Sequence, residues 1–428
     1  MPFSLTDQGD FQRRLNACKE RPVSGIHSWH RYFGKLIPAI PAAAIEAYAL
    51  PGLPVIDLFA GSGTTLVEAK LHGVDAVGVD ISPIAGLIER VKTTYIDPVL
   101  LAQAGTLLQK DMAGMRPPAP EGELPFCIHR DNWFRPEVQD DLYWLREGIE
   151  QLFLRHPELP AEKASDVQDL LLLNLSSVIR LVSNADPQHI FPGYSKRLRA
   201  LDAAGKRHID VIRSFFSALR KKISSMADYV PAYRRAAQVS VLTGSAAAQS
   251  LSLPQAGLIV VNPPYISSVR YIETMKLELY WMGFLNSAAE YRSLERQMTG
   301  NDRFFRADLE RLPDTGRAET DTLASALWNT DPACGVTFAN YFRDMAGAVS
   351  RMSVLLPPGG RVVMKISDSK MKRLQVETPR LMTGLAEEHG FFCEEAFLDP
   401  IVRRSLLTAR NSYSDLITHD YILVWRRL

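Results

Sequence analysis

Cysteine is scarce in this chain, and its placement excludes several kinds of site. Only four cysteines occur, with no C-x-x-C pair and no Cys/His spacing typical of zinc ligands: Cys18, Cys127, Cys334 and Cys393. Structural zinc is therefore not expected, and scattered thiols fit a reducing compartment. No apolar run approaches the roughly eighteen residues of a transmembrane helix, and residues 1–14 lack the apolar core of a signal peptide. We expect a cytoplasmic protein without a membrane partner.

A strong net charge is also missing. The 428 residues include 49 Lys and Arg against 48 Asp and Glu, which gives a formal charge of +1. A uniform attraction to nucleic acid is therefore excluded, and any such contact depends on local clusters of charge. The apolar content of 46% and the charged content of 23% are typical of a globular chain. The length allows about two or three domain-sized units.

The phosphate-binding glycine motifs are absent, although a glycine turn is present. The run Val55-Ile56-Asp57-Leu58, apolar except for its acid, leads into Phe59-Ala60-Gly61-Ser62-Gly63-Thr64-Thr65, which predicts a strand, a tight turn and a helix. No third glycine is in phase and no Gly-Lys-Ser/Thr occurs, so this is neither a G-x-G-x-x-G motif nor a P-loop. Glycine lets the backbone approach a ligand, and the helix start offers free N–H groups. About twenty residues later a second predicted strand ends at Asp80, which could accept both hydroxyls of a ribose.

The most informative stretch is Asn262-Pro263-Pro264-Tyr265. It follows the apolar run 258–261, which predicts a buried strand, and the two prolines end that strand because neither can donate to a sheet ladder. Open α/β sheets bind ligands at this carboxyl edge. The Asn262 side-chain oxygen and the Pro263 carbonyl could accept hydrogen bonds from a planar exocyclic amine while Tyr265 stacks on its ring. A surface turn after a core strand is the alternative, and four residues alone do not exclude it.

Taken together, these motifs resemble the S-adenosylmethionine-dependent DNA aminomethyltransferases, which methylate N6 of adenine or N4 of cytosine. Residues 57–63 are similar to the family's cofactor motif, Asp80 to its ribose acid, and residues 262–265 to its catalytic motif. Residues 27–38 resemble the N-terminal element that closes over the methionine end of the cofactor. The resemblance covers roughly residues 25–95 and 238–428 and hardly touches the piece between them.

The resemblance implies a set of site residues, a cofactor and a partner. The cofactor is S-adenosyl-L-methionine, the partner is double-stranded DNA, and a cognate restriction enzyme could accompany the protein. The implied catalytic residues are Asn262, Pro263, Pro264 and Tyr265. The implied cofactor-binding residues are Tyr32, Lys35, Asp57, Phe59, Ala60, Gly61, Ser62, Gly63, Thr64, Thr65, Asp80, Ile81 and Ser245. The reaction needs no metal, and we expect the pair His27 and His30, which has no third ligand nearby, to pack or hydrogen-bond instead.

Two features bear on the target base. The first catalytic position is Asn262, which favours adenine N6, with cytosine N4 as the alternative. Many members of the family have an acid in the loop after the strand 239–242, but this chain has Thr243-Gly244-Ser245 there. No cysteine follows a proline, so the covalent nucleophile of cytosine C5 methylation is missing, whereas direct transfer to an amine needs none.

The implied fold is a Rossmann-like α/β methyltransferase sheet with a terminal antiparallel hairpin, plus a mainly helical insert. Residues 1–99 would hold the lid element and the cofactor-binding half, residues 100–235 the insert, and residues 236–428 the catalytic half with a variable stretch at about 286–338. Apolar stripes of helical period predict helices over 137–154, 166–182 and 207–226. Strands are predicted at 361–366, 392–397 and 421–425.

Basic residues cluster in the predicted helical insert. The clusters are Lys196-Arg197-Leu198-Arg199, Lys206-Arg207-His208, Arg220-Lys221-Lys222 and Arg234-Arg235. A single cluster is typical of a solvated helix face, but four within about forty residues favour contact with phosphates. The stretch 286–338 is the alternative recognition surface. Neither region has a helix-turn-helix or zinc-finger signature, so no recognition sequence can be derived.

Two other functions fit part of the pattern. RNA and protein-glutamine methyltransferases also use Asn-Pro-Pro-Tyr, but they usually bring a recognition domain before the cofactor strand, where this chain has only about fifty residues. A non-catalytic nucleic-acid-binding subunit is disfavoured by the intact Asp57, Gly61, Gly63 and Asp80.

Overall fold

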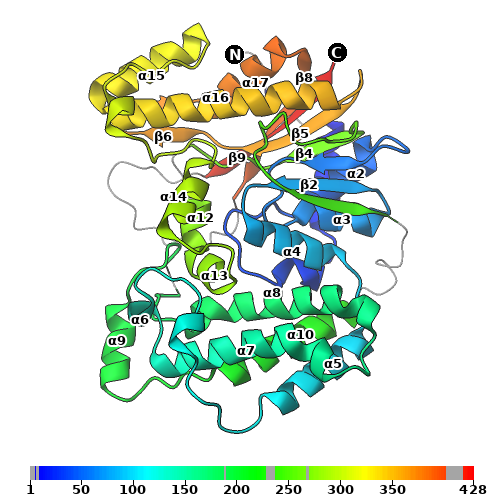
Figure 1. Cartoon of the computed structure of the whole chain (residues 1–428). Coiled ribbons are helices and arrows are strands. Elements are labelled where there is room, and N and C mark those ends of the chain that lie inside the picture. The colour runs from blue at the N-terminus through cyan, green and yellow to red at the C-terminus, as the bar shows by residue number, and fades with distance from the viewer. Residues whose placement is uncertain (1–4, 6–8, 188, 228–236, 267–268, 402–417) are drawn as a thin grey trace.

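The computed structural model describes the whole chain except residues 1–4, 6–8, 188, 228–236, 267–268 and 402–417. Its centre is a seven-stranded sheet with the order β3-β2-β1-β4-β5-β9-β8 (Figure 1). The strands are β1 (Val55–Asp57), β2 (Ala76–Asp80), β3 (Val239–Thr243), β4 (Leu258–Val261), β5 (Arg361–Ile366), β8 (Phe391–Pro400) and β9 (His419–Arg427). A separate hairpin pairs β6 (Ser369–Met371) with β7 (Leu374–Val376).

The strand directions give the sheet a parallel body and an antiparallel edge. Strands β3, β2, β1, β4 and β5 are parallel, with Val55 opposite both Ala76 and Leu258. Strand β9 runs antiparallel between β5 and β8. The sheet therefore has the Rossmann-like form with a terminal antiparallel hairpin that the sequence predicted. Because the chain moves outward in opposite directions from β1 and β4, the point where the order reverses lies between these two strands.

Alternation along the strands builds two apolar layers, one on each face of the sheet. In β4, Leu258 and Val260 face one cluster while Ile259 and Val261 face the other, as the two-residue period of a strand requires. The first cluster holds α1 (Asp10–Lys19), α2 (Ala39–Tyr48) and α3 (Thr64–His72). The second holds α15 (Ala318–Thr330), α16 (Pro332–Leu355) and α17 (Thr378–Glu388).

The mainly helical insert forms a layer of its own, below the sheet in Figure 1. Its helices are α5 (Pro98–Asp111), α6 (Arg130–Trp133), α7 (Pro136–Arg155), α8 (Ala164–Val182), α9 (Lys196–Ala203) and α10 (Val211–Ala227), with the short 3-10 helices η2 (Glu121–Glu123) and η3 (Ala161–Lys163). The predicted helices at 137–154 and 166–182 agree with α7 and α8 within about two residues, and α10 begins later than the predicted position 207. One apolar cluster joins these helices to α4 (Pro83–Thr93) and α13 (Lys276–Trp281).

Most of the remaining elements connect the turn 262–265 to β5. They are α12 (Tyr271–Thr274), α14 (Ala288–Arg296) and the 3-10 helix η4 (Arg306–Leu309), which lead to α15 and α16, and another 3-10 helix, η1 (Gly25–Ser28), precedes α2. In Figure 1, α12, α13 and α14 lie between the insert and the sheet layer. Among the residues that the structure describes, no helix is long and apolar enough to cross a membrane.

Candidate active site

A cavity opens where β1, β2 and β4 end. It contains about 840 Å³ of empty space including its mouth, which is in the size range of small-molecule sites, about 300–1,000 Å³. Because β1 and β4 are parallel neighbours, the turns that follow them lie side by side at this edge. The cavity is therefore at the switch point of the sheet, where open α/β folds bind ligands.

The glycine turn after β1 forms one wall of the cavity. Gly61 has a φ of 51°, in the left-handed region that glycine adopts without strain. A Cβ on Gly61 would lie 3.0 Å from the Tyr32 hydroxyl oxygen, so the position has no room for a side chain. Asp57 holds the turn from inside, accepting from the Phe59 N–H at 3.0 Å and from the Thr65 hydroxyl at 2.6 Å. Burial raises the pKa of Asp57 to about 7.

Asp80, at the end of β2, joins the second strand to the glycine turn. Its Oδ2 accepts from the Gly61 N–H at 3.0 Å and its Oδ1 from the Ser82 N–H at 2.8 Å. Burial raises the pKa of Asp80 to about 6, although these N–H groups act in the opposite direction. A carboxylate oxygen has two lone pairs, so each Asp80 oxygen can accept a further hydrogen bond from a ligand in the cavity.

Two ionisable residues of α4 lie against the glycine turn. Lys92 is fully buried and donates to the Ser62 carbonyl oxygen at 2.9 Å. Glu89 is fully buried too, and neither of its side-chain oxygens has a hydrogen-bond partner among the residues described. Burial raises the pKa of Glu89 well above its usual range. Neither residue was predicted from the sequence, although charged residues three apart on a mainly apolar helix were the available signal.

The N-terminal segment covers the cavity from the other side. Tyr32 and Lys35 line the cavity, and the Tyr32 ring stacks on Tyr271 with centroids 6.1 Å apart. Lys35 Nζ donates to the His27 carbonyl at 2.8 Å and to the His30 carbonyl at 2.7 Å, and burial lowers the Lys35 pKa to about 8. Lys35 therefore fixes the backbone of this segment.

The two histidines of the segment have separate partners. His27 Nε2 lies 2.7 Å from a Glu68 oxygen, whereas His30 Nε2 lies 3.0 Å from the Ser176 hydroxyl. Within the described ranges, no group of three His, Cys, Asp or Glu side chains is placed to hold a metal ion.

The turn after β4 places Asn262 at the edge of the cavity. Its amide Nδ2 donates to the Gly34 carbonyl oxygen at 2.8 Å. Its Oδ1 is buried and has no hydrogen-bond partner among the described residues. A buried acceptor without a donor costs free energy, about 1–3 kcal/mol, unless a ligand supplies the donor. Asn262 and Pro264 line the cavity, and the arrangement can receive an N–H group from a bound molecule.

Similar proteins point to the same chemistry as this geometry. The Type II methyltransferase M.MvaI of Kocuria varians is 24% identical over 383 residues, covering 85% of this chain and 81% of its own length. M.BsoBI of Geobacillus stearothermophilus, also a Type II methyltransferase, is 25% identical over 174 residues, which are 40% of this chain and 32% of that protein. The chain is similar to Type II DNA methyltransferases over most of its length. It is accordingly an S-adenosylmethionine-dependent methyltransferase.

Other comparisons add less about this methyltransferase. M.MjaII of Methanocaldococcus jannaschii is 40% identical over 79 residues, only 18% of this chain and 15% of its own. No protein-family model matches the chain. The solved structures of TrmN from Thermus thermophilus and of the rRNA methyltransferase aviRa from Streptomyces viridochromogenes align with 96% and 98% of the chain and with 54% and 94% of their own. Their identities are 12% and 10%, and a TM-score of 0.31 for each is too low to inform on substrate.

The structure of the methyltransferase brings most of the predicted site residues together. Those that line the cavity are Tyr32, Lys35, Asp57, Phe59, Ala60, Gly61, Ser62, Thr64, Asp80, Ile81, Asn262 and Pro264. In the described part of the chain, the lining does not include Gly63, Thr65, Ser245, Pro263 or Tyr265. Gly63 starts α3 in a left-handed conformation, and Thr65 is turned to Asp57. Ser245 lies between the lining residues Gly244 and Ala246, so its role in cofactor binding stays a prediction.

Part of the cavity wall was not predicted. Tyr271 and Ile272 come from α12, and Met298 and Thr299 follow α14 in the variable stretch 286–338. The stretch 286–338 carries no motif, so the return of Met298 and Thr299 to the cavity depends on tertiary packing. The variable stretch therefore contributes to the cavity itself as well as to the surface of the methyltransferase.

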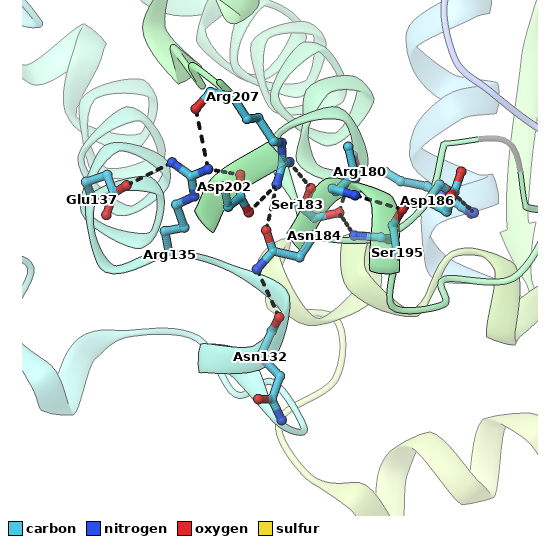
Figure 2. Close-up of polar contacts among 12 residues, drawn as sticks. Asn132, Arg135, Glu137, Arg180, Ser183, Asn184, Asp186, Ser195, Asp202 and Arg207 are labelled. Carbon is cyan, nitrogen blue, oxygen red and sulfur yellow. Dashed lines mark hydrogen bonds and ion pairs between the residues drawn. The ribbon is translucent and has the colours of Figure 1, made fainter. Parts of the chain in front are cut away.

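The predicted basic clusters have unequal roles in the methyltransferase. Figure 2 shows Arg207 held inside a polar network, where it donates to Asn184 Oδ1 at 2.8 Å and to Asp202 Oδ2 at 3.2 Å. Lys222 is only 5% exposed and donates to Asn174 at 3.0 Å and Ser177 at 3.1 Å. The prediction of phosphate contact is thus wrong for these two side chains, because both are turned inward and form hydrogen bonds within the insert. Lys196, Arg197, Arg199, Lys206, Arg220 and Lys221 are exposed. Arg234-Arg235 lies outside the described residues.

Proposed function

We propose that this methyltransferase moves a methyl group from S-adenosyl-L-methionine to an exocyclic amine of a base flipped out of double-stranded DNA. The single observation that carries the proposal is the buried, unpartnered Oδ1 of Asn262 at the edge of the cavity. An amine N–H is the donor that this oxygen lacks, and the amide is already fixed by Gly34. The Type II methyltransferase names of the similar proteins support DNA as the substrate.

The residues of the cavity fit the proposed cofactor. Asp80 offers free lone pairs for ribose hydroxyls, and the glycine turn has no side chain that would block the backbone from the ligand. Tyr32 and Lys35 would cover the bound cofactor from the N-terminal segment. When bound, S-adenosyl-L-methionine supplies a methyl group already activated on a sulfonium, so the protein mainly has to position the acceptor.

The turn 262–265 would position the acceptor amine. Asn262 Oδ1 and the Pro263 carbonyl would accept the two amine hydrogens, which draws the nitrogen lone pair out of the ring plane toward the methyl group. Tyr265 would stack on the ring of the flipped base, a contact worth about 1–3 kcal/mol. Flipping costs a few kcal/mol, and holding the reactants in near-attack geometry supplies much of the rate.

The target base is the finer part of the proposal. Adenine N6 and cytosine N4 are both planar NH2 groups, and the acceptor pair fits either one. Asn262 in the first position of the motif favours adenine. The proposed path for the duplex passes the exposed Lys196, Arg197 and Arg199 of α9, whose charges would meet phosphates.

The proposal can be tested by incubating the protein with labelled S-adenosyl-L-methionine and, separately, with duplex DNA, total RNA and a protein extract. We expect label in duplex DNA, and mass spectrometry of the nucleosides distinguishes N6-methyladenine from N4-methylcytosine. Label confined to RNA or to protein glutamine would contradict the proposal, and no label anywhere would favour a non-catalytic binding subunit. Sequencing genomic DNA with modified-base detection, with and without the gene, reveals the site and whether a restriction enzyme must share it.

A further inference from the structure

Three elements meet at the hydroxyl of Tyr265. The hydroxyl donates to Asp420 Oδ1 at 2.8 Å and accepts from Lys365 Nζ at 3.0 Å. Lys365 lies near the end of β5 and Asp420 near the start of β9, and the two side chains form an ion pair with Nζ and Oδ2 2.6 Å apart. The Ser367 hydroxyl also donates to Asp420 Oδ1, at 2.5 Å. Tyr265, the aromatic residue of the catalytic turn, is therefore tied to two strands of the sheet that follow it in sequence.

Stability alone does not account for this ion pair. The Lys365 and Asp420 side chains are 13% and 7% exposed. Burying two charges costs desolvation that their attraction only about offsets, and apolar residues of similar volume would hold the same place at least as well. The ion pair instead orients Tyr265, because Lys365 Nζ and Asp420 Oδ1 both form hydrogen bonds with its phenol oxygen.

The tether fixes the far end of the Tyr265 ring. The ring packs in part against the apolar cluster that holds α16, and Lys365 Nζ lies 5.5 Å from the ring centroid, yet Tyr265 stays partly exposed. Hydrogen bonds to the phenol oxygen stop the ring from swinging about χ1. Because hydrogen bonds of a phenol prefer to lie near the ring plane, one donor and one acceptor also favour one orientation about χ2 before any base arrives. Stacking energy depends on that plane and on the offset of the two rings. Because the same two hydrogen bonds occupy the hydroxyl, it is not available to accept a proton from the amine.

We propose that Asp420 and Lys365 are positioning residues of the methyltransferase, which hold the Tyr265 ring in the plane on which the flipped base stacks. The inference rests on the proposed function, since it needs a base in the site. Neither residue is expected to touch cofactor or base.

A double-mutant cycle on Tyr265→Phe and Asp420→Asn tests this coupling. Tyr265→Phe keeps the ring and removes the tethered oxygen, and Asp420→Asn keeps the size and removes the charge. We expect each variant to lower kcat/KM for duplex DNA by roughly tenfold, the loss of one charge-assisted hydrogen bond, with S-adenosyl-L-methionine affinity unchanged. The double variant should be no worse than Tyr265→Phe alone, because Asp420→Asn acts only through the hydroxyl that Tyr265→Phe removes.

The fluorescence of 2-aminopurine at the target position reports base placement independently of turnover. With wild-type protein it should rise on flipping and then be quenched by the stacked ring, and both single variants should show less quenching. Arg361→Met is the matched control, since Arg361 lies at the opposite end of β5 and pairs with Glu394 at 2.8 Å. It should leave quenching and kcat/KM as in the wild type.

The outcomes separate the two proposals. The positioning role is overturned if the wild type is active and Asp420→Asn lowers kcat/KM by the same factor in the Tyr265→Phe variant as in the wild type. A normal kcat/KM in the Asp420→Asn variant would overturn it too. A wild type that methylates no DNA overturns the proposed function, and this inference with it. If Asp420→Asn unfolds because Lys365 is left unpaired, Lys365→Met with Asp420→Asn removes both charges and runs the same comparison.

Discussion

The side-chain amide of Asn262 donates a hydrogen bond of 2.8 Å to the backbone carbonyl oxygen of Gly34. The contact joins the turn after β4 to the N-terminal segment, 228 positions earlier in the chain. A carbonyl can only accept, so the NH2 end of Asn262 is turned to Gly34 and Oδ1 is left as a free acceptor. The acceptor that the proposed chemistry requires is thus oriented before substrate binds, which lowers the reorganisation needed during reaction.

Asp80→Ala should weaken binding of S-adenosyl-L-methionine by roughly 1–3 kcal/mol, because charge-assisted hydrogen bonds to the ribose are removed. The substitution also frees the Gly61 and Ser82 N–H groups that Asp80 now holds. Titration calorimetry measures the change, and circular dichroism checks the fold. An affinity equal to that of the wild type would show that Asp80 is not the ribose acid.

Cofactor affinity should fall as the pH is lowered through about 6. Burial raises the pKa of Asp80 to about 6, so the carboxylate that accepts from ribose is present above that pH and protonated below it. Each pH unit below the pKa costs at most about tenfold in affinity, and binding near pH 6 should release a proton. The pKa of Asp57 is raised to about 7 by burial, so some loss begins earlier. Asp80→Asn should remove the step near pH 6, and a step that survives in this variant would refute the assignment.

Gly61→Ala should abolish much of the cofactor affinity, whereas Gly52→Ala should not. Both glycines have positive φ, 51° and 77°, so alanine at either costs about 1–2 kcal/mol of stability in the left-handed region. Only at Gly61 would the new Cβ meet another group, the Tyr32 ring, since nothing lies within 4 Å of the position at Gly52. Thermal unfolding and cofactor titration of the pair separate backbone strain from obstruction of the cavity. Equal affinities in the two variants would contradict the assignment of this wall.

Charge reversal of Lys196, Arg197 and Arg199 should weaken binding to every duplex alike. It should also reduce the slope of log affinity against log salt, by about 0.9 for each DNA phosphate that these side chains no longer neutralise. Reversal of Arg13 and Arg14, on a helix that packs in the sheet domain, is the control and should leave the slope unchanged. If the α9 variant keeps the wild-type slope, the insert is scaffold, and the stretch 286–338 becomes the leading recognition surface.

The sequence was sufficient for the centre of the sheet because β1, β2 and β4 are short, mainly apolar runs that end at an acid or shortly before proline. Residues 258–261 are all buried and stop at Pro263, as expected from the missing donor of proline. The first glycine turn, Asp80 and Asn262 could be placed together because parallel neighbours share a carboxyl edge. Local patterns thus located one side of the site.

The rest of the site depends on contacts that no local pattern encodes. Met298 reaches the cavity from a stretch without a motif, and Asp420 reaches Tyr265 from 155 positions away. The sequence predicts Arg207 and Lys222 to be exposed cations, yet each donates hydrogen bonds to polar groups inside the insert. Burial decides these roles, and burial of a charged side chain follows from the packing of several helices at once.

The most direct test of the account is the rate of methyl transfer by Asn262→Ala, measured together with its cofactor affinity. The substitution removes an acceptor that matters most as the amine nitrogen becomes pyramidal, so kcat should fall by at least about a hundredfold. S-adenosyl-L-methionine should still bind within about threefold of the wild type, because Asp80 and the glycine turn are untouched. A variant that methylates duplex DNA at close to the wild-type rate would contradict the proposed mechanism, whatever its cofactor affinity.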